Sequence, residues 1–172
     1  MTNLKLAALA TTALAAITLV ACDRMGGGID SSLGLGKAKA VSPVAAATPF
    51  DRALYTEYLA QSQAEYNGGD YIDSDLYADN ARLAAMGNPT GPMMPIQRHL
   101  PIGKADELSK NYFRLTFAFA AKAKELAPQD TARAQVMYDC WLEQQEEANQ
   151  ARDIAACRDG FMAAMAKVEA AL

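Results

Sequence analysis

The sequence predicts an all-α protein, a bundle of about five helices in antiparallel hairpins that follows a flexible N-terminal linker. Three observations support this prediction. From residue 50 onward, apolar residues recur every three or four positions, which is the spacing of one helix face. Glycine or proline interrupts the pattern at Gly68-Gly69, Gly87 and Pro128, where helices commonly end or begin. The 123 residues from 50 to 172 are enough for one hydrophobic core.

Residues 1–21, which precede the linker, have the layout of a secretory signal peptide. A short start with one positive charge, Lys5, is followed by an apolar run at residues 6–20 that is shorter than the roughly 20 residues of a transmembrane helix. Leu19-Val20-Ala21-Cys22 then resembles, position by position, the cleavage box of bacterial lipoproteins. We therefore predict that Cys22 is lipidated, because a thiolate is the nucleophile that accepts a diacylglyceryl group.

Lipid on Cys22 would attach the mature protein to a membrane, because two or more acyl chains hold a protein stably on a bilayer. We therefore expect a lipid-anchored protein of the cell envelope that faces the periplasm. Asp23 follows the cysteine, and a similar arrangement in enteric bacteria is retained at the inner membrane. Other lineages do not follow this rule, so the choice between the inner and outer membrane stays open.

The composition argues against nucleic acid as a partner. Removal of Lys5 with the signal peptide leaves 15 basic and 20 acidic side chains, a net charge of −5, and no basic patch stands out. Two cysteines, Cys140 and Cys157, remain if Cys22 carries lipid. An even number of remaining cysteines in an exported protein indicates one disulfide.

Residues 22–48 are expected to form a flexible, lipidated linker, and residues 49–172 a helical periplasmic domain. The linker is rich in glycine, serine and alanine and has no aromatic residue, so it cannot bury enough apolar surface to order itself. The first helix begins after Thr48, which forms a capping pattern with Pro49 and Asp51. It ends near residue 66, and its predicted apolar face consists of Phe50, Leu54, Tyr55, Tyr58 and Leu59.

A second helix is expected from Asp70 to Met86, because Asp70 and Asp73 suit a helix N-terminus and Gly87 can end a helix. Its predicted inward stripe consists of Ile72, Leu76, Leu83 and Met86. The two helices together resemble a tetratricopeptide-type hairpin at Ala64-Glu65-Tyr66, Gly69-Asp70-Tyr71, Tyr77 and Ala81. Since repeat arrays need about three units, we expect a single hairpin and not a repeat protein.

Residues 88–103 are expected to be an irregular connection, because four prolines oppose both a helix and a central strand. His99, the only histidine, has no second ligand at metal-binding spacing, so we interpret it as a surface residue and expect no metal site. The next helix is expected at residues 104–127. Its broad apolar sector predicts a central helix with neighbours on two sides. The sector consists of Leu108, Tyr112, Phe113, Leu115, Phe117, Phe119 and Leu126.

Two more helices are expected at residues 128–149 and 151–172. The predicted inward residues of the first are Val136, Met137, Cys140 and Trp141. The acids near its end are interpreted as a solvated helix end, not as an acid–base pair, which would need burial; they are Glu143, Glu146 and Glu147. The stripe of the second helix is Ile154, Cys157, Phe161, Met165, Val168 and Leu172. The midpoint of the two cysteines falls in the intervening turn, so Cys140 and Cys157 should face each other and form the disulfide.

Segments 134–147 and 153–158 resemble the N-terminal helical module of alphaproteobacterial lipoproteins in the outer-membrane protein A family, and the opening at residues 50–55 fits the same module. This resemblance implies an envelope lipoprotein with a helical periplasmic module, and it favours the outer membrane. In that family a peptidoglycan-binding domain follows the module. We do not expect such a domain after Leu172, so cell-wall binding is not carried over to this chain.

The sequence contains no nucleophile elbow, metal-ligand spacing or phosphate loop, so we expect neither an enzyme nor a cofactor. The first function hypothesis is a structural or interaction protein, a scaffold or accessory subunit that works with other envelope proteins. The alternative is a helical binding module for a peptide or small ligand. Tyrosine combines an apolar ring with a polar tip, which suits a partly hydrated groove. The candidate binding residues are Tyr55, Tyr58, Tyr66, Tyr71 and Tyr77.

Overall fold

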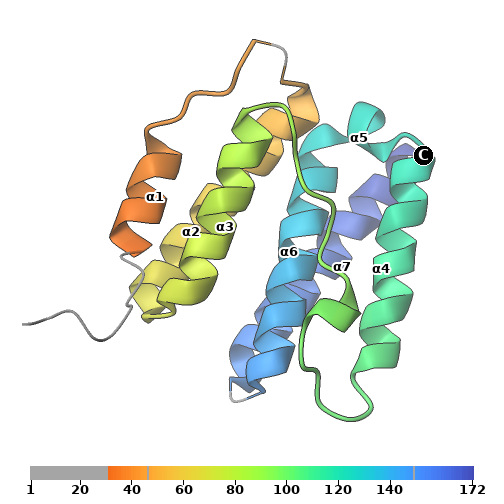
Figure 1. Cartoon of the computed structure of the whole chain (residues 1–172). Coiled ribbons are helices and arrows are strands. Elements are labelled where there is room, and N and C mark those ends of the chain that lie inside the picture. Colours follow the sequence, from red (N-terminus) through yellow and green to blue (C-terminus); the bar gives the residue numbers. More distant parts are fainter. Residues whose placement is uncertain (1–30, 46, 149) are drawn as a thin grey trace, which may run out of the picture.

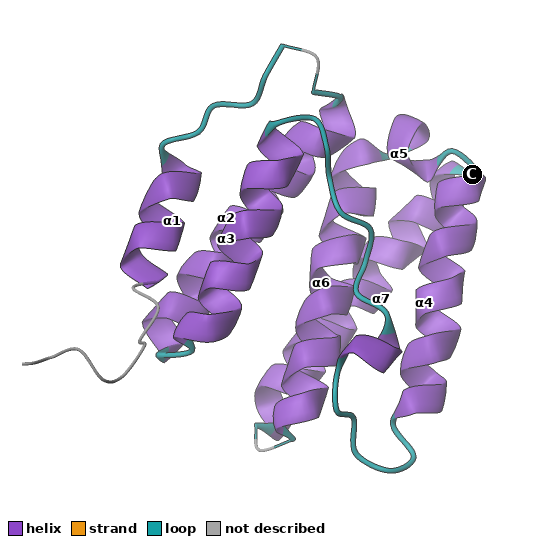
Figure 2. Ribbon diagram, viewed as in Figure 1, coloured by secondary structure: helices purple, strands orange, loops and turns teal. Residues whose placement is uncertain are grey.

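The computed structural model describes residues 31–45, 47–148 and 150–172, and these residues form an all-helical structure (Figures 1 and 2). The elements are α1 (Ser31–Lys39), α2 (Pro49–Gly68), α3 (Tyr71–Ala85), the 3-10 helix η1 (Pro95–Gln97), α4 (Ala105–Ala120), α5 (Ala123–Leu126), α6 (Pro128–Glu147) and α7 (Ala151–Ala171). No strand occurs among the described residues, which confirms the all-α class. None of the helices described is both long enough and apolar enough to cross a bilayer.

The helices pack as two groups that meet where α2 contacts α6. α2 and α3 form one hairpin, with α1 against it, and α6 and α7 form a second hairpin, with α4 beside it (Figure 1). The connection from α3 to α4, residues 86–104, runs along α6 between the two groups (Figure 1). The predicted arrangement in helical hairpins is therefore confirmed.

Local sequence signals determine the ends of the α2–α3 hairpin. The Thr48 hydroxyl accepts a hydrogen bond from the Asp51 N–H at 3.1 Å, and the Asp51 carboxylate accepts one from the Thr48 N–H at 2.8 Å. Gly69 has a φ of 90°, a left-handed conformation that closes α2. The Asp70 carboxylate then accepts a hydrogen bond from the Asp73 N–H at 3.0 Å and caps α3. The predicted capping box, glycine stop and acidic helix start are all present.

The prediction of a flexible linker over residues 22–48 is wrong for the part that forms α1. Leu35 and Ala38 are buried, and α1 contacts both α2 and α3. The Tyr55 hydroxyl of α2 donates a hydrogen bond to the Val41 carbonyl at 2.9 Å, just beyond the end of α1. The glycine- and alanine-rich composition did not reveal this packing, because a stretch with so few large apolar residues shows no clear helical pattern.

α3 turns a different face inward from the predicted one. Ile72, Leu76 and Met86 are exposed, and Ile72 reaches 74% exposure. The buried face consists mainly of small residues: Ser74, Ala78, Ala81, Ala84 and Ala85. The Ser62 hydroxyl of α2 donates to the Ser74 carbonyl at 2.7 Å, and the Ser74 hydroxyl donates to the Ser62 carbonyl at 2.9 Å. This reciprocal pair needs a close approach of the two helices, which large aliphatic side chains on this face would prevent.

The helix predicted at residues 104–127 is broken, and α4 lies at the edge of the molecule (Figure 1). α4 ends before Lys122, whose φ of 69° redirects the chain into α5. Leu115 faces the core, but Phe113 and Phe117 point to solvent. The prediction of a central helix was therefore wrong, because a broad apolar sector does not reveal whether a partner covers all of it.

The central helix is α6, which contacts α2, α4, α5 and α7. Between residues 131 and 145, Arg133 alone is exposed. Trp141 packs on Phe161 of α7, with ring centroids 6.0 Å apart, and Tyr138 packs on the same ring at 5.7 Å. The inward positions predicted for this helix are buried, together with polar positions that the sequence analysis did not place inside.

α7 packs on α6 through most of the stripe predicted for it, since Phe161, Met165 and Val168 are fully buried. Leu172, the last predicted position, is exposed. A disulfide joins Cys140 of α6 to Cys157 of α7, and their Cα atoms are 5.7 Å apart. The predicted pairing is confirmed. The bond links the two helices of this hairpin close to the turn between them.

Removal of this disulfide should destabilise the folded chain. The two cysteines are 17 residues apart, and closure of a loop of this size stabilises a protein by about 3 kcal/mol in the chain-entropy model. We expect the melting temperature of a Cys140→Ser, Cys157→Ser double variant to fall by several degrees in scanning calorimetry. Reductant should lower the melting temperature of the wild-type protein similarly and leave the double variant unchanged. A wild-type melting temperature that does not respond to reduction would contradict this prediction.

Candidate functional site

A groove of about 650 Å³ lies between the two hairpins. Its walls come from the C-terminal half of α2, the turn into α3, and both helices of the α6–α7 hairpin. Among the described residues, four acidic ones line the groove, and they are Glu65, Asp70, Glu147 and Asp153. Arg133 is the one basic residue of this described lining. The groove therefore carries an excess of acidic groups, which favours a cationic ligand.

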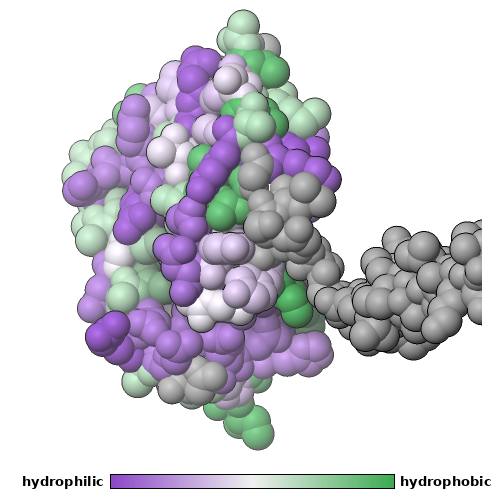
Figure 3. Space-filling model, turned by 90° about the vertical axis from the view of Figure 1, so that its left-hand side faces the viewer, coloured by the Kyte–Doolittle hydropathy of each residue, from purple (hydrophilic) through white to green (hydrophobic). Residues whose placement is uncertain are grey.

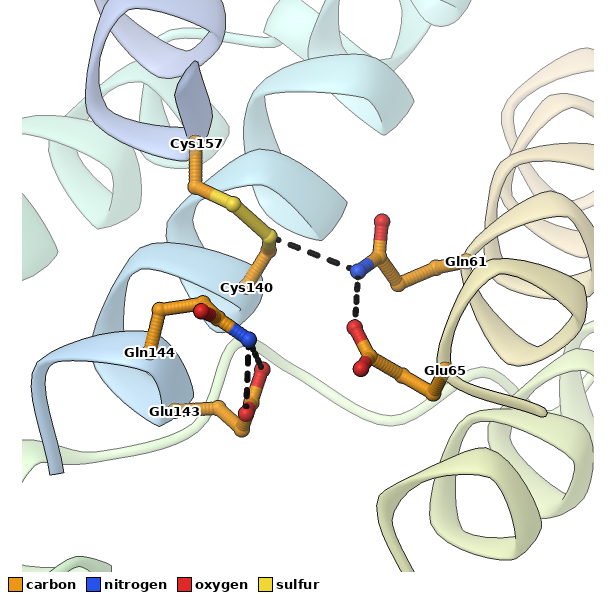
Figure 4. Close-up of a disulfide and its surroundings, with 6 residues drawn as sticks. All are labelled: Gln61, Glu65, Cys140, Glu143, Gln144 and Cys157. Atoms are coloured by element: carbon orange, nitrogen blue, oxygen red, sulfur yellow. Dashed lines mark hydrogen bonds between the residues drawn. A yellow bond between two sulfur atoms is a disulfide. The ribbon is translucent and has the colours of Figure 1, made fainter. Parts of the chain in front are cut away.

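The disulfide forms part of the groove wall (Figure 4). Gln61 of α2 reaches toward it, with its Nε2 atom 3.4 Å from Cys140 Sγ and 2.6 Å from the Glu65 carboxylate. Because Cys140 and Cys157 are joined, neither offers a thiolate for nucleophilic chemistry. We interpret the disulfide as structural, since it holds α6 and α7 together along the groove.

Asp139 is the first of two carboxyl groups that α6 carries into the interior, and it is fully buried. The Tyr58 hydroxyl donates to its Oδ2 atom at 2.6 Å, and the Met93 N–H donates to its Oδ1 atom at 2.7 Å. Gln135 donates to the Tyr58 oxygen at 2.9 Å. Burial raises the pKa of Asp139 to about 7, although the two hydrogen bonds and the Arg98 charge favour the ionised form. Asp139 thereby joins α2, α6 and the α3–α4 connection.

Glu143 lies one turn further along α6 and is also fully buried. Burial is the main cause that raises its pKa to about 9, and the charges of Glu65 and Asp73 raise it further. The Gln144 amide donates to both carboxyl oxygens, at 3.1 and 3.3 Å, which opposes this shift (Figure 4). The Glu143 carboxyl group is therefore protonated at neutral pH unless a cation lies beside it.

Arg98, on the α3–α4 connection, carries a positive charge into this region. Its guanidinium pairs with Asp73 of α3 and, at 3.0 Å, with Glu146 of α6. The His99 N–H donates to the Glu146 carboxylate at 2.7 Å. Burial acts to raise the pKa of Glu146, but the contacts with His99 and Arg98 outweigh it and lower that pKa. These contacts hold the connection against both hairpins.

Three carboxylates from the two hairpins lie close together beside the groove. One of them, Asp70, also forms part of the groove wall. Asp70, Asp73 and Glu143 each offer an oxygen that lies within 4.8 Å of the others. Tyr77 is fully buried beside them, and its hydroxyl has no hydrogen-bond partner within the described part of the chain. Burial raises the pKa of Tyr77, and the charges of Glu143 and other nearby carboxylates raise it further. A set of oxygen atoms of this kind suits a hard cation.

A second surface feature, here called the aromatic face, lies on α4 and the end of α7. Phe113 and Phe117 are 57% and 71% exposed. The apolar lining of a depression of about 620 Å³ on this face consists of Phe113, Phe117, Ala118, Ala121 and Leu172. Lys110 lies at its edge, and Arg114 donates to the Glu169 carboxylate at 2.6 and 2.7 Å. By contrast, hydrophilic residues cover much of the face that carries α1 (Figure 3).

The five tyrosines proposed as binding residues do not form one exposed surface. Tyr58 and Tyr77 are fully buried, with ring centroids 6.0 Å apart. Tyr55 is partly buried against the end of α1, and the rings of Tyr66 and Tyr71 lie 5.4 Å apart at the turn between α2 and α3. The prediction is wrong for Tyr58 and Tyr77, because their rings are part of the core that joins α2, α3 and α6.

Glu143, Glu146 and Glu147 do not form the solvated helix end that the sequence indicated. Glu143 is buried, Glu146 is partly buried in an ion pair, and Glu147 alone of the three is exposed. The spacing of Gln135, Asp139 and Glu143 was the available signal. These residues are four positions apart, so they form a polar stripe on a helix that is apolar on its other side.

Two other predicted sites have different outcomes. Cys22 lies outside the described residues, and its lipidation stays a prediction. His99 is an exposed surface residue, as expected, and its Nδ1 atom is 3.3 Å from the Glu146 carboxylate. The expectation of no metal site was drawn from the surroundings of His99 in the sequence, and it did not consider carboxylates that only folding brings together.

Comparison with protein-family models, with curated proteins and with solved structures finds no match to this chain. The resemblance to the outer-membrane protein A family therefore stays a prediction. The function has to be argued from three features of the molecule: the groove, the buried carboxyl groups beside it and the aromatic face.

The folded chain should lose stability as the pH rises through the titration range of Glu143. A glutamate in an unfolded chain loses its proton near pH 4.3, about the value for model peptides, whereas folding raises the pKa of Glu143 to about 9. Between these values the folded state binds one proton more than the unfolded state at this site. The free energy of unfolding therefore falls with rising pH.

Glu143→Gln should remove this contribution and flatten the pH dependence. Denaturant unfolding in the presence of a chelator, at about pH 5 and about pH 8, measures the effect. We expect the variant to exceed the wild type in stability at the higher pH. Glu125→Gln, which changes an exposed residue of α5, is the matched control. A variant with the wild-type pH slope would show that Glu143 is not buried in its neutral form.

Proposed function

We propose that this protein is a lipid-anchored scaffold or accessory protein of the cell envelope, which holds a protein partner on the aromatic face of α4. The observation that carries the proposal is the exposure of Phe113 and Phe117 on one side of an edge helix. Exposed apolar patches commonly mark interaction sites. Aromatic residues are also enriched in protein interfaces, where a few of them contribute most of the binding energy.

The aromatic face is rigid enough to serve as a docking surface. Leu115 and Ala118 of α4 are buried, so the helix is packed against the body on its inner side. Arg114 forms a two-pronged ion pair with Glu169, which ties α4 to α7 on the same face as the exposed rings. A surface held in this way loses little conformational entropy when a partner binds.

The chemistry of this face fits an amphipathic helix that carries an acidic side chain. α4 has 16 residues, which gives a length of about 24 Å, enough to lie against several turns of a partner helix. Lys110 is exposed and forms no ion pair among the described residues, whereas Arg114 is already engaged by Glu169. An acidic side chain of the partner would therefore bind at Lys110, while apolar side chains cover the two phenylalanines.

The proposed lipid on Cys22 supports an envelope role for the helical body. Because α1 packs on the body, the segment between the anchor and the body is residues 22–30, shorter than the linker expected from the sequence. At about 3.5 Å per residue, a segment of this length spans at most roughly 32 Å. The body would thus work close to the membrane surface, on its periplasmic side.

A second candidate function is a binding module for a small cationic ligand or a basic peptide. The groove between the hairpins favours it, since Glu65, Asp70, Glu147 and Asp153 line a space of about 650 Å³. A concave surface with one sign of charge concentrates ligands of the opposite sign. In this candidate function the binding surface is the carboxylate-lined groove and not the tyrosine surface that the sequence predicted.

Site-specific photo-crosslinking in intact cells tests the docking proposal. A photoreactive phenylalanine analogue at position 117 should give one discrete adduct with an envelope protein, because the position lies within the proposed interface. The same analogue in place of Ile96, which is 87% exposed on η1, should give no such adduct. Phe113→Ser and Lys110→Glu should each weaken the adduct at position 117. Equal adducts from both positions, or an adduct only with a second copy of the chain, would contradict the proposal.

Replacement of Cys22 tests the anchor. Cys22→Ala removes the thiol that accepts the lipid, so the precursor should accumulate without cleavage at the lipoprotein box. Metabolic labelling with a fatty-acid probe should give signal in the wild type and none in the variant. Cys140→Ser, Cys157→Ser should keep the label, since those thiols lie in the body. Normal labelling of the Cys22→Ala protein would rule out this anchor.

A further inference from the structure

We infer that Asp70, Asp73 and Glu143 form a binding site for a divalent cation of the calcium and magnesium class. The inference rests on the second candidate function, the binding module, and names the class of ligand that enters beside the groove. It is independent of the aromatic face and of the lipid anchor.

The three carboxylates meet at a separation that one cation can bridge. Asp70 and Asp73 come from the start of α3, Glu143 comes from α6, and each offers an oxygen within 4.8 Å of the others. Oxygen ligands lie about 2.3–2.6 Å from Ca²⁺, so two ligands on opposite sides of the ion are about 5 Å apart. The set consists of carboxylate oxygens without histidine or thiolate, which favours calcium or magnesium over zinc or copper.

The Tyr77 hydroxyl is a second, independent observation that points to a ligand. The side chain is fully buried, and the hydroxyl has no hydrogen-bond partner among the described residues. Tyr77 lies one turn after Asp73 on the buried face of α3, and the charge of Glu143 acts on its hydroxyl. A buried hydroxyl without a hydrogen-bond partner destabilises a fold. A water molecule bound to the cation would supply the missing partner.

Gln144 supplies a further oxygen without a partner on the groove wall. Its side-chain carbonyl oxygen, Oε1, is buried and unpaired within the described structure, while its amide nitrogen donates to Glu143. Amide carbonyl oxygens are regular ligands of Ca²⁺. Because Gln144 and Asp70 both line the groove, a cation can reach the carboxylates from solvent.

Acidic groups outnumber basic groups around the three carboxylates. Glu65 and Glu147 lie close enough to Asp70 and Asp73 to interact with them electrostatically. Arg98 supplies one positive charge, which it shares between Asp73 and Glu146. Glu143 adds a further negative charge once it loses its proton. The ion pair does not block Asp73, because an ionised carboxylate has about four lone-pair sites. A divalent cation would supply the charge that the protein's own bases do not.

Calorimetric titration of calcium chloride, and separately of magnesium chloride, into the chelator-treated full-length protein in detergent tests the inference. We expect one bound cation per chain and a melting temperature that rises with cation concentration, because the cation joins α3 to α6 in the folded state only. Glu143→Gln should weaken binding by at least about tenfold. Asp70→Asn should weaken it as well, and it keeps the helix cap because asparagine also caps helices. Glu125→Gln, on α5, should change nothing.

Absence of binding by both cations would overturn the inference. So would equal affinity in the wild type and in Glu143→Gln, since exposed acids would then account for the binding. A hexa-arginine peptide, titrated in the same way, separates this failure from failure of the binding module. If the peptide binds and Glu65→Gln weakens its binding while neither cation binds, the module stands and the cation site fails. If neither the peptide nor a cation binds, both fail.

Discussion

The polar stripe on buried helix α6 is the constraint on which the rest of the structure depends. Gln135, Asp139 and Glu143 are all fully buried on the central helix. A buried polar group without a partner destabilises a protein by about 1–3 kcal/mol, and a charged group by more. The rest of the chain must therefore bring partners to this stripe. Tyr58 from α2 and the Met93 N–H from the α3–α4 connection do so, and these requirements determine where α2 and the connection lie.

α6 contacts its two neighbouring hairpin helices by different means, and this difference creates the groove. Toward α7 the contact is apolar and covalent, through the packing of Trp141 on Phe161 and the Cys140–Cys157 bond. Toward α2 the contact is largely polar, and a space of about 650 Å³ remains between the hairpins. Polar groups and carboxylates at such a boundary can give up hydrogen bonds within the protein and bind a ligand instead. The aromatic face lies elsewhere, on α4, so the molecule offers two chemically different surfaces.

The sequence was sufficient wherever a local signal decides the outcome. Thr48 and Gly69 marked the ends of α2, and the disulfide followed from the symmetry of a helical hairpin about its turn. The sequence was insufficient wherever the outcome depends on which helix face is covered by a neighbour, as for Ile72 and Phe117. Periodicity shows which residues share a helix face, but it does not show which face is buried. The carboxylate cluster was missed because Glu143 is distant in sequence from Asp70 and Asp73, and because each residue had a local explanation, the two aspartates as a helix start and Glu143 as a helix end.

The most direct test of this account is the titration of the two buried carboxyl groups of α6, followed by NMR of the full-length protein with ¹³C-labelled aspartate and glutamate in metal-free buffer. Assignment comes from the loss of one signal each in Asp139→Asn and Glu143→Gln. The account predicts a pKa of about 7 for Asp139 and about 9 for Glu143. If both groups titrate with a pKa near 4, about the value of solvent-exposed carboxyl groups, α6 does not carry a buried polar stripe and the account is wrong.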